Sequence, residues 1–510
     1  MKKSTILLAA AALLASFGTT AIAQSSYAEW AHRVESTDSE FSTVNNVVTD
    51  GEHLYLNASY NGNVTFLGQV LPYYVGSNAV VVKTDLDGNP IWQATLGGNG
   101  IDGFFDIALD SQGNVIATGW SDSTDDVEIN GEVVIAGDGS FATKGIVAKF
   151  SGTDGSLIWI KDWAAAEFTV ANPVRLAVDA EDNVYLGGYY SSSFQVDGVS
   201  FAYHHEFGED LYMLKLDSTG TAVWGQTLEA VDSGGFINMR GVEANANGVY
   251  FAFSYYLPLV VNGTPLPHEG DFYWLAITRV DPATGVVGDY TAFGSASGGQ
   301  DFSQLKSDGE NNLVVSGFFD SDSGFAVQSI PLGGHGSQDG FVAKLDADLD
   351  VVWANDIGGS SADRAFNLFV SASNGIYVGG GFDSLSALSY GSTQILDSRI
   401  PSSLSMYELY VDRDGNFDGA LGLYGEAAGL RGKGGGTVLS NARSVALPDG
   451  SVYSVGNFNG TVQFTPGDEV STLHNTGFFM KWADALPAVS DCIFADGFEA
   501  GGAGCGGLGM

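Results

Sequence analysis

The segment that decides the fold runs Asp339-Gly-Phe-Val-Ala-Lys-Leu-Asp346 and continues to Val351-Val-Trp353. Two short apolar runs are separated by an Asp-containing turn, which is the pattern of an antiparallel β-hairpin. In another copy of the same repeat, Asn183-Val-Tyr-Leu-Gly-Gly188 predicts one further strand bounded by turn residues. The chain is therefore predicted to consist of short β-strands.

This pattern recurs along the sequence. A first strand ends in an Asp-containing turn, a second has a fixed Tyr or aliphatic position, a third often reads Val-Ala-Lys-Leu-Asp, and a fourth often carries Trp. The fixed position is filled seven times, by Tyr55, Ile116, Tyr185, Tyr250, Val314, Tyr377 and Tyr453. Because a four-stranded unit buries little surface alone, seven copies predict an all-β fold, a seven-bladed β-propeller of four-stranded antiparallel blades.

The strands of each blade are called A to D from the axis outward. In blade 2 they are predicted at Phe104 to Asp110, Val115 to Trp120, Gly145 to Phe150, and Leu157 to Trp163. These limits are set by Gly, Asp, Asn and Ser residues, which favour turns.

The two ends of the repeat region are complementary. Tyr27-Ala28-Glu29-Trp30-Ala31 matches a strand D, whereas the last repeat stops after Phe478-Phe-Met-Lys-Trp482, which matches a strand C. The N-terminal strand is therefore predicted to be the outer strand of blade 7, with Trp30 beside the strand that contains Lys481. Such pairing would close the ring and protect an open sheet edge.

These motifs resemble the bacterial seven-bladed propeller repeats often called SBBP repeats, over about residues 27 to 484. The resemblance implies the propeller fold but no common activity, because fold alone does not fix function. Blade 4 has Val286-Val287 where Trp is expected, and blade 6 has Tyr410 where Lys is expected. Those two blades are predicted to diverge most in packing.

Three segments of the chain are distinguished. Residues 1–23 combine Lys2 and Lys3, a short apolar stretch and a small-x-small site, which predicts a signal peptide and export to the periplasm or beyond. Residues 24–486 form the predicted propeller, and residues 487–510 a Gly-rich tail. The tail holds Cys492 and Cys505, and an oxidising compartment favours a disulfide between them.

The chain is strongly acidic, with a formal net charge of −40. Nucleic acid is therefore an unfavourable partner, since its binding relies on cationic patches. Membrane insertion is not expected either, because no later segment is long and apolar enough to span a bilayer. A glycan or protein ligand at the cell surface or outside is the expected partner.

Cations recur at one position of strand C: Lys83, Lys149, Lys215, Lys344 and Lys481, with Arg279 in blade 4. We expect their stems to pack against neighbouring strands while each charge meets a carboxylate such as Asp50, Asp110 or Asp179. The alternative is a cationic binding face.

Candidate ligand-binding residues lie where repeated loops should share one face. Strand A is preceded by a loop carrying Asp102, Asp301 or Asp363, and His268 and His335 lie in long insertions between strands B and C. Loops B–C and D–A emerge at the same end of an antiparallel blade, and such loops often carry function. These carboxylates could instead bond loop amides.

A metal site is the other possibility. His204, His205 and Glu209 are plausible metal ligands, and Asp-rich turns could bind calcium or another divalent cation. No cofactor is otherwise predicted. Asp85-Leu-Asp87-Gly88-Asn89 resembles the start of a calcium loop, but Leu96 stands where the final Glu is required, so we expect a hairpin turn.

The sequence contains no recognisable catalytic motif, so no catalytic residue is predicted. The first hypothesis is an exported binding scaffold that uses loops on one face. The alternative is a carbohydrate-active enzyme, a lyase or hydrolase, with its active site in the central depression.

Overall fold

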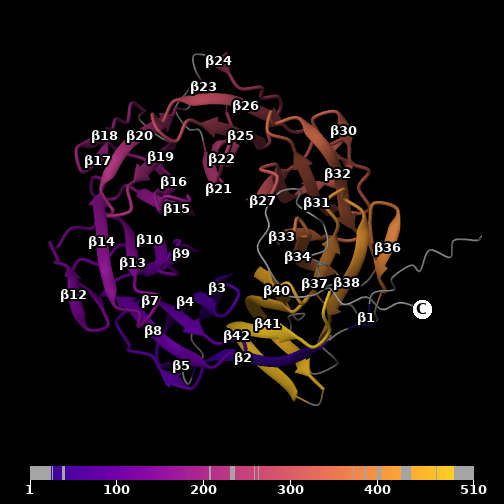
Figure 1. The fold of residues 1–510 in the computed structure, drawn as a ribbon, viewed down its shortest axis with the longest axis horizontal. Coiled ribbons are helices and arrows are strands. Elements are labelled where there is room, and N and C mark those ends of the chain that lie inside the picture. The colour runs from indigo at the N-terminus through magenta and orange to yellow at the C-terminus, as the bar shows by residue number, and fades with distance from the viewer. Residues whose placement is uncertain are drawn as a thin grey trace, which may run out of the picture.

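The computed structural model describes residues 24–486, apart from 26, 37–40, 206–207, 230–235, 258, 262–263, 372, 384–385, 399–403, 427–437 and 467. Seven four-stranded antiparallel sheets radiate from a central axis (Figure 1). The predicted seven-bladed β-propeller is confirmed. The predicted signal peptide and the tail with Cys492 and Cys505 lie outside the described residues.

The strands follow one order in every blade, from the axis outward. Strands A are β3 (Ser42–Thr49), β9 (Asp102–Leu109), β15 (Ala171–Val178), β21 (Ile237–Asn245), β27 (Gln300–Ser307), β33 (Arg364–Val370) and β40 (Val438–Ala446). Strands B are β4 (Leu54–Asn61), β10 (Val115–Ser121), β16 (Val184–Tyr190), β22 (Gly248–Tyr255), β28 (Leu313–Asp320), β34 (Ile376–Asp383) and β41 (Val452–Thr465). Strands C are β7 (Ser77–Thr84), β13 (Lys144–Phe150), β19 (Asp210–Leu216), β25 (Trp274–Val280), β31 (Gln338–Leu345), β37 (Leu404–Val411) and β42 (Asp468–Trp482). Strands D are β8 (Pro90–Gly97), β14 (Leu157–Ala164), β20 (Ala222–Leu228), β26 (Val287–Phe293), β32 (Val351–Gly358), β38 (Phe417–Leu423) and, for blade 7, β2 (Ala28–Ser36). The four strands of blade 2 agree with the predicted limits to within two residues.

Short elements complete the described part of the chain. They are β1 (Gln24–Ser25), β39 (Gly425–Glu426) and a 3-10 turn, η1 (Ser321–Ser323). In that part of the chain, no helix has the length and apolar composition required to cross a membrane.

The ring is closed by the two ends of the repeat region, as predicted. Strand β2 pairs antiparallel with β42, and Trp30 lies opposite Lys481. The Trp30 ring packs edge-to-face on Phe479 with 4.9 Å between ring centroids, and Lys481 Nζ lies 2.7 Å from Glu29 Oε2. Residues far apart in sequence therefore hold blade 7 together (Figure 1).

The repeated Lys and Trp act together across blade boundaries. Lys83 Nζ and Trp92 Nε1 both donate to the carbonyl of Gly152, in the C–D turn of the next blade, at 2.8 and 3.1 Å. Two other pairs bond one carbonyl of the next blade in the same way: Lys215 and Trp224 to Pro282, and Lys344 and Trp353 to Arg413. We call this arrangement the inter-blade clasp.

The expected carboxylate partners are present in some blades. Lys149 Nζ lies 2.8 Å from Asp110, and Lys344 Nζ lies 2.7 Å from Asp308, with all four side chains buried. The expectation was wrong for Asp50 and Asp179, whose carboxylates instead accept hydrogen bonds from Tyr55 and Tyr185. In those blades the lysine reaches the carbonyl of the clasp.

In blades 4 and 6, other residues take the place of the Lys or the Trp of the inter-blade clasp. Arg279 Nη1 in blade 4 still donates to the carbonyl of Ala347 in blade 5 at 3.1 Å. By strand register the Trp position of this blade is filled by Asp289 rather than by Val287, and Asp289 forms an ion pair with Arg279. In blade 6, Tyr410 packs on Tyr377 with 4.9 Å between ring centroids.

The insertions after strand B form small hairpins rather than free loops. They are β5 (Val64–Phe66) with β6 (Gln69–Val70), β11 (Val127–Ile129) with β12 (Glu132–Ile135), β17 (Phe194–Val196) with β18 (Val199–Phe201), β23 (Val260–Val261) with β24 (Thr264–Pro265), β29 (Ala326–Val327) with β30 (Ile330–Pro331), and β35 (Leu388–Tyr390) with β36 (Thr393–Leu396). Three of them pair with strand D of the preceding blade, β5 with β2, β11 with β8 and β35 with β32. The insertion of blade 4 also buries apolar residues, namely Leu259, Val261 and Leu266. The insertions therefore cover sheet edges as well as reaching the surface.

Candidate functional site

The strands nearest the axis share one irregularity. In every blade the A–B pairing skips one residue of strand A, which is the geometry of a β-bulge. The residues that follow the skipped position are Asn46, Asp106, Arg175, Gly241, Gln304, Asn367 and Arg443. A bulge redirects the chain beside it, and here these seven positions all contribute to the lining of one axial cavity.

The cavity lies between the second halves of the seven A strands and has a volume of about 290 Å³. Its charged lining consists of Arg175, Lys306 and Arg443 against Asp106 and Glu243. Cations therefore exceed carboxylates in the cavity, although the chain as a whole carries a formal charge of −40.

Asp106 is fixed on one side of the cavity by several donors. Asn46 Nδ2 donates to Asp106 Oδ1 at 2.5 Å, and the backbone amide of Ile107 donates to the same oxygen at 3.1 Å. The amide of Leu176 in blade 3 donates to Oδ2 at 3.3 Å. Hydrogen bonds from these three donors hold the carboxylate in place.

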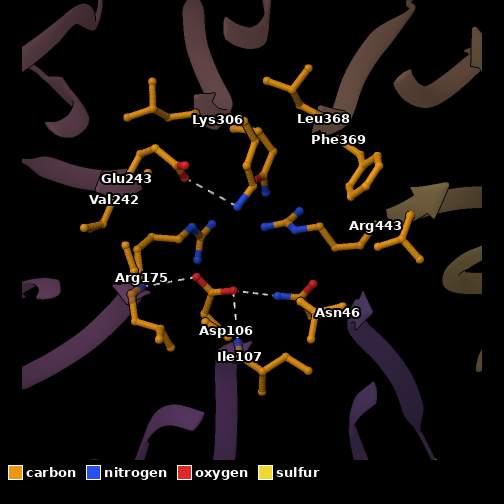
Figure 2. Close-up of a pocket in the computed structure, with 18 of the residues that line it drawn as sticks. Asn46, Asp106, Ile107, Arg175, Val242, Glu243, Lys306, Leu368, Phe369 and Arg443 are labelled. Atoms are coloured by element: carbon orange, nitrogen blue, oxygen red, sulfur yellow. Dashed lines mark hydrogen bonds and ion pairs between the residues drawn. The ribbon is translucent and has the colours of Figure 1, made fainter. Parts of the chain in front are cut away.

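Two arginines converge on the same space from blades 3 and 7. Figure 2 shows the guanidinium groups of Arg175 and Arg443 pointing toward each other across the cavity, close to Asp106. Arg175 is anchored through Nε to the carbonyl of Arg240 at 3.0 Å and through Nη1 to its neighbour Val174 at 2.7 Å. Arg443 Nε lies 2.7 Å from the side-chain oxygen of Gln304 when that amide is oriented to accept.

Burial and like charge both act on these arginines. Burial and, after it, the nearby charge of Arg175 lower the pKa of Arg443 to about 10, while Asp106 opposes the shift. The pKa of Arg175 is also lowered, first by burial and then by the proximity of Arg240. Arginine side chains stay protonated in proteins, so two half-buried positive charges face each other.

The predicted ligand-binding carboxylates lie elsewhere, at the starts of strands A. Asp102 and Asp363 are buried: Ser123 Oγ donates to Asp102, and the amides of Gly359 and Asp383 donate to Asp363 at 2.6 and 3.1 Å. Burial raises the pKa of Asp102, and it raises the pKa of Asp363 to about 7.

Asp301, the third of these carboxylates, forms an ion pair between blades. Arg240 Nε donates to Asp301 Oδ1 at 3.0 Å, and Nη2 lies 2.5 Å from Oδ2. Burial raises the pKa of Asp301 although Arg240 opposes the shift. The carbonyl of Arg240 also anchors Arg175, so this ion pair adjoins the axial site.

The predicted histidines lie in the insertions of different blades. His335 Nε2 is 3.6 Å from Asp356 Oδ1, and His268 Nε2 is 3.2 Å from the carbonyl of Phe272. Each of these contacts stays within its own blade. Their binding role stays a prediction.

The predicted metal residues occupy the insertion of blade 3. His204 is exposed, His205 Nε2 lies 3.4 Å from Asp210 Oδ1, and burial raises the pKa of Glu209. Among the described residues, no three or more His, Cys, Asp or Glu side chains are arranged to hold a metal ion. The Asp85 segment forms a capped turn, in which Asp85 accepts from the amides of Asp87 and Asn89.

Sequence reasoning missed the axial residues because they differ from blade to blade. One signal was available: among only 20 Lys and Arg residues, Arg175 and Arg443 share a repeat position within strand A, outside the strand C register. Both lie ten residues before the fixed position of strand B, Tyr185 in one copy and Tyr453 in the other.

The chain is similar to solved structures at low sequence identity. No family model matches the sequence, and no curated protein matches it. Solved structures that are similar include the polysaccharide lyase Uly1, with 8% identity, a TM-score of 0.43, and coverage of 89% of this chain and 99% of that one. A PL25 ulvan lyase has 10% identity, a TM-score of 0.36, and coverage of 89% and 95%. A phage phi92 endosialidase has 10% identity, a TM-score of 0.36, and coverage of 94% and 72%. The likeness to SBBP repeats stays a prediction.

Proposed function

We propose that this protein is an exported binding protein whose ligand site is the axial cavity and whose ligand carries an anionic group. The observation that carries the proposal is the convergence of Arg175 and Arg443 in a cavity where cations outnumber carboxylates. The expected glycan or protein partner would be recognised through a carboxylate or a similar anion, since guanidinium groups match such acceptors.

The energetics favour a ligand over a purely structural role. Two half-buried like charges oppose folding, as the lowered pKa of Arg443 indicates, and Asp106 offsets part of this cost. A bound anion would offset this penalty, because it would face both guanidinium groups. Groups with strongly shifted pKa values in a cavity are candidates for function.

Binding of simple anions tests the proposal. The probes are acetate, glucuronate and sulfate, titrated by ligand-observed NMR against the protein and its Arg175→Gln and Arg443→Gln variants. Wild-type protein should bind at least one anion, and each variant should weaken that binding by about tenfold or more, the loss expected for a charge-assisted hydrogen bond.

The control variant is Arg413→Gln, which removes a surface arginine from the C–D turn of blade 6. It should leave anion binding unchanged. No detectable binding by the wild type, or equal losses in all three variants, would refute the axial site.

A second experiment separates the axial site from the predicted loop face. The double variant His268→Ala and His335→Ala removes exposed or half-exposed side chains of the insertions and leaves the cavity lining intact. It should bind the same anion as the wild type. Loss of binding in this variant alone would move the site to the loops.

The enzyme alternative has its own test. A uronate-containing polysaccharide is incubated with the protein and its products are analysed for new sugar ends. Binding without new ends supports the binding protein, whereas turnover that requires Arg175 would support a carbohydrate-active enzyme at the same cavity.

A further inference from the structure

The axial cavity also has an apolar side, and from it we infer that the ligand is a compact monocarboxylate with an apolar body. The carboxylate would face Arg175 and Arg443, and the apolar body would lie along the part of the cavity nearer the A–B turns. This inference rests on the proposed function and narrows the ligand class.

The post-bulge side chains form one ring of the cavity lining. A second ring of side chains lies next to it and is mainly apolar. Side chains two residues apart on a strand point to the same side, so each post-bulge position is followed by a second lining position. Those second positions are Val48, Ala108, Ala177, Glu243, Lys306, Phe369 and Val445. Five of the seven are apolar, and Val48, Ala108 and Phe369 are only half-buried, so they offer surface to a ligand.

The two polar side chains of this ring, Glu243 and Lys306, lie close to each other, and Glu243 also accepts a hydrogen bond from Ser307. Ser307 Oγ donates to Glu243 Oε1 at 2.7 Å, and Lys306 Nζ lies 3.7 Å from Glu243 Oε2. Glu243 would repel a second negative charge on the ligand. Figure 2 shows Glu243 and Lys306 together on one side of the cavity, away from Asp106.

The charge balance indicates how many charges the ligand carries. Three cations and two carboxylates line the cavity, so one negative charge makes the filled cavity neutral. A site whose lining and ligand charges balance avoids part of the desolvation cost of excess charge. A monoanion therefore fits better than a dianion or a polyanion.

The volume restricts the size of the ligand. A cavity of about 290 Å³ lies near the lower limit for small-molecule sites. It corresponds to about ten water molecules at their liquid volume. Benzoate, a planar carboxylate on one apolar ring, is a probe of suitable size.

The experiment compares three probes on the full chain by isothermal titration: benzoate, acetate and benzamide. Benzoate has both features, acetate lacks the apolar body, and benzamide lacks the charge. Benzoate should bind about 10- to 100-fold more tightly than acetate, because burial of a ring contributes free energy of that size. Benzamide should be weaker than benzoate by about tenfold or more.

Two variants test whether benzoate binds in the axial cavity. Arg175→Gln should reduce benzoate affinity by about tenfold or more and remove its advantage over benzamide, whereas Arg413→Gln should leave both unchanged. Circular dichroism of each variant verifies that the propeller remains folded.

The possible outcomes separate the two claims. If acetate or glucuronate binds as tightly as benzoate in an Arg175-dependent way, the proposed function holds and the apolar-body inference is overturned. If sulfate, a dianion, outcompetes benzoate, the monoanion argument is overturned. If no probe binds the wild type, the proposed function itself fails.

Discussion

The indole of Trp92 in blade 1 lies directly against Gly155 in the C–D turn of blade 2. A Cβ at Gly155 would lie 2.6 Å from Trp92 Cε3, and the glycine has a φ of +72°. Gly285 and Gly415 are related in the same way to Trp224 and Trp353. The turn glycine is thus the third part of the inter-blade clasp.

Gly155→Ala should therefore lower stability for two reasons, a strained backbone and a clash with Trp92. Gly131→Ala is the matched control, since Gly131 has a φ of +83° and a Cβ added there would meet no atom within 4 Å. The control should cost about 1 kcal/mol for the backbone alone, and Gly155→Ala should cost clearly more. Chemical denaturation measures both, and equal losses would show that the clasp adds nothing.

Trp30→Ala tests the closure of the ring. Trp30 packs against Phe479 and the turn at Gly88, although it is only half-buried. The expected loss in the free energy of unfolding is about 3 kcal/mol, the lower end for removal of a large aromatic side chain. A variant as stable as the wild type would contradict the importance of this seam.

Lys149→Met tests the buried ion pair with Asp110. Removal of one partner leaves a buried carboxylate without its cation, which costs about 3 to 5 kcal/mol. Lys161→Met is the control, because its ion pair with Asp197 is about 30% exposed and should contribute less than about 1 kcal/mol. If the two variants are equally stable, the buried pair has no special role.

Asp363 should make stability depend on pH. Its pKa is about 7 in the folded protein, mainly because of burial, against an ordinary value of 3.8. The folded state therefore holds this proton more tightly than the unfolded state. Its contribution to stability is fully present below pH 3.8 and is lost as the pH rises to about 7.

The Asp363→Asn variant should accordingly gain stability relative to the wild type between about pH 4 and pH 8. Asp138→Asn is the control: the amide of Ser140 lowers the pKa of this exposed carboxyl, so its difference from the wild type should stay flat in that range. Urea denaturation at several pH values measures both differences. A flat difference for Asp363→Asn would show that its carboxyl is ionised throughout.

Arg443→Gln separates a binding role from a structural one. Burial and Arg175 lower the pKa of Arg443 to about 10, so its positive charge opposes folding at neutral pH. The variant should unfold at the same denaturant concentration as the wild type or at a higher one. A loss above about 1 kcal/mol would indicate that Arg443 serves mainly to link blade 7 to Gln304 of blade 5 and to the carbonyl of Phe366 in blade 6.

The fold could be predicted because the residues that determine each blade recur along the sequence. The position of Tyr55 recurs in seven copies, and the strand carrying Trp30 supplies the strand D missing after Trp482, so ring size and closure follow from the sequence. The blade insertions were harder to interpret. Their hairpins cover neighbouring strands D, a relation between blades that no single repeat displays.

The candidate site could not be predicted for the opposite reason. Asp106, Arg175 and Arg443 occupy equivalent positions in three blades, but the residue at this position varies around the ring, so no motif arises. Histidines and loop carboxylates were predicted to bind a ligand or a metal because of their chemistry and their clustering in the sequence. The bulge that brings the axial side chains together is a property of backbone pairing and has no sequence signature of its own.

The pairing of β2 with β42 can form only at a late stage of synthesis. Trp30 and Lys481 are 451 residues apart, so at about 5 to 20 residues per second the first strand waits roughly 20 to 90 s for its partner to be synthesised. During that interval its hydrogen-bonding edge is open to other chains. A chain that stops before Asp468 would lack β42 and leave the paired part of this strand exposed, even with the other six blades already folded.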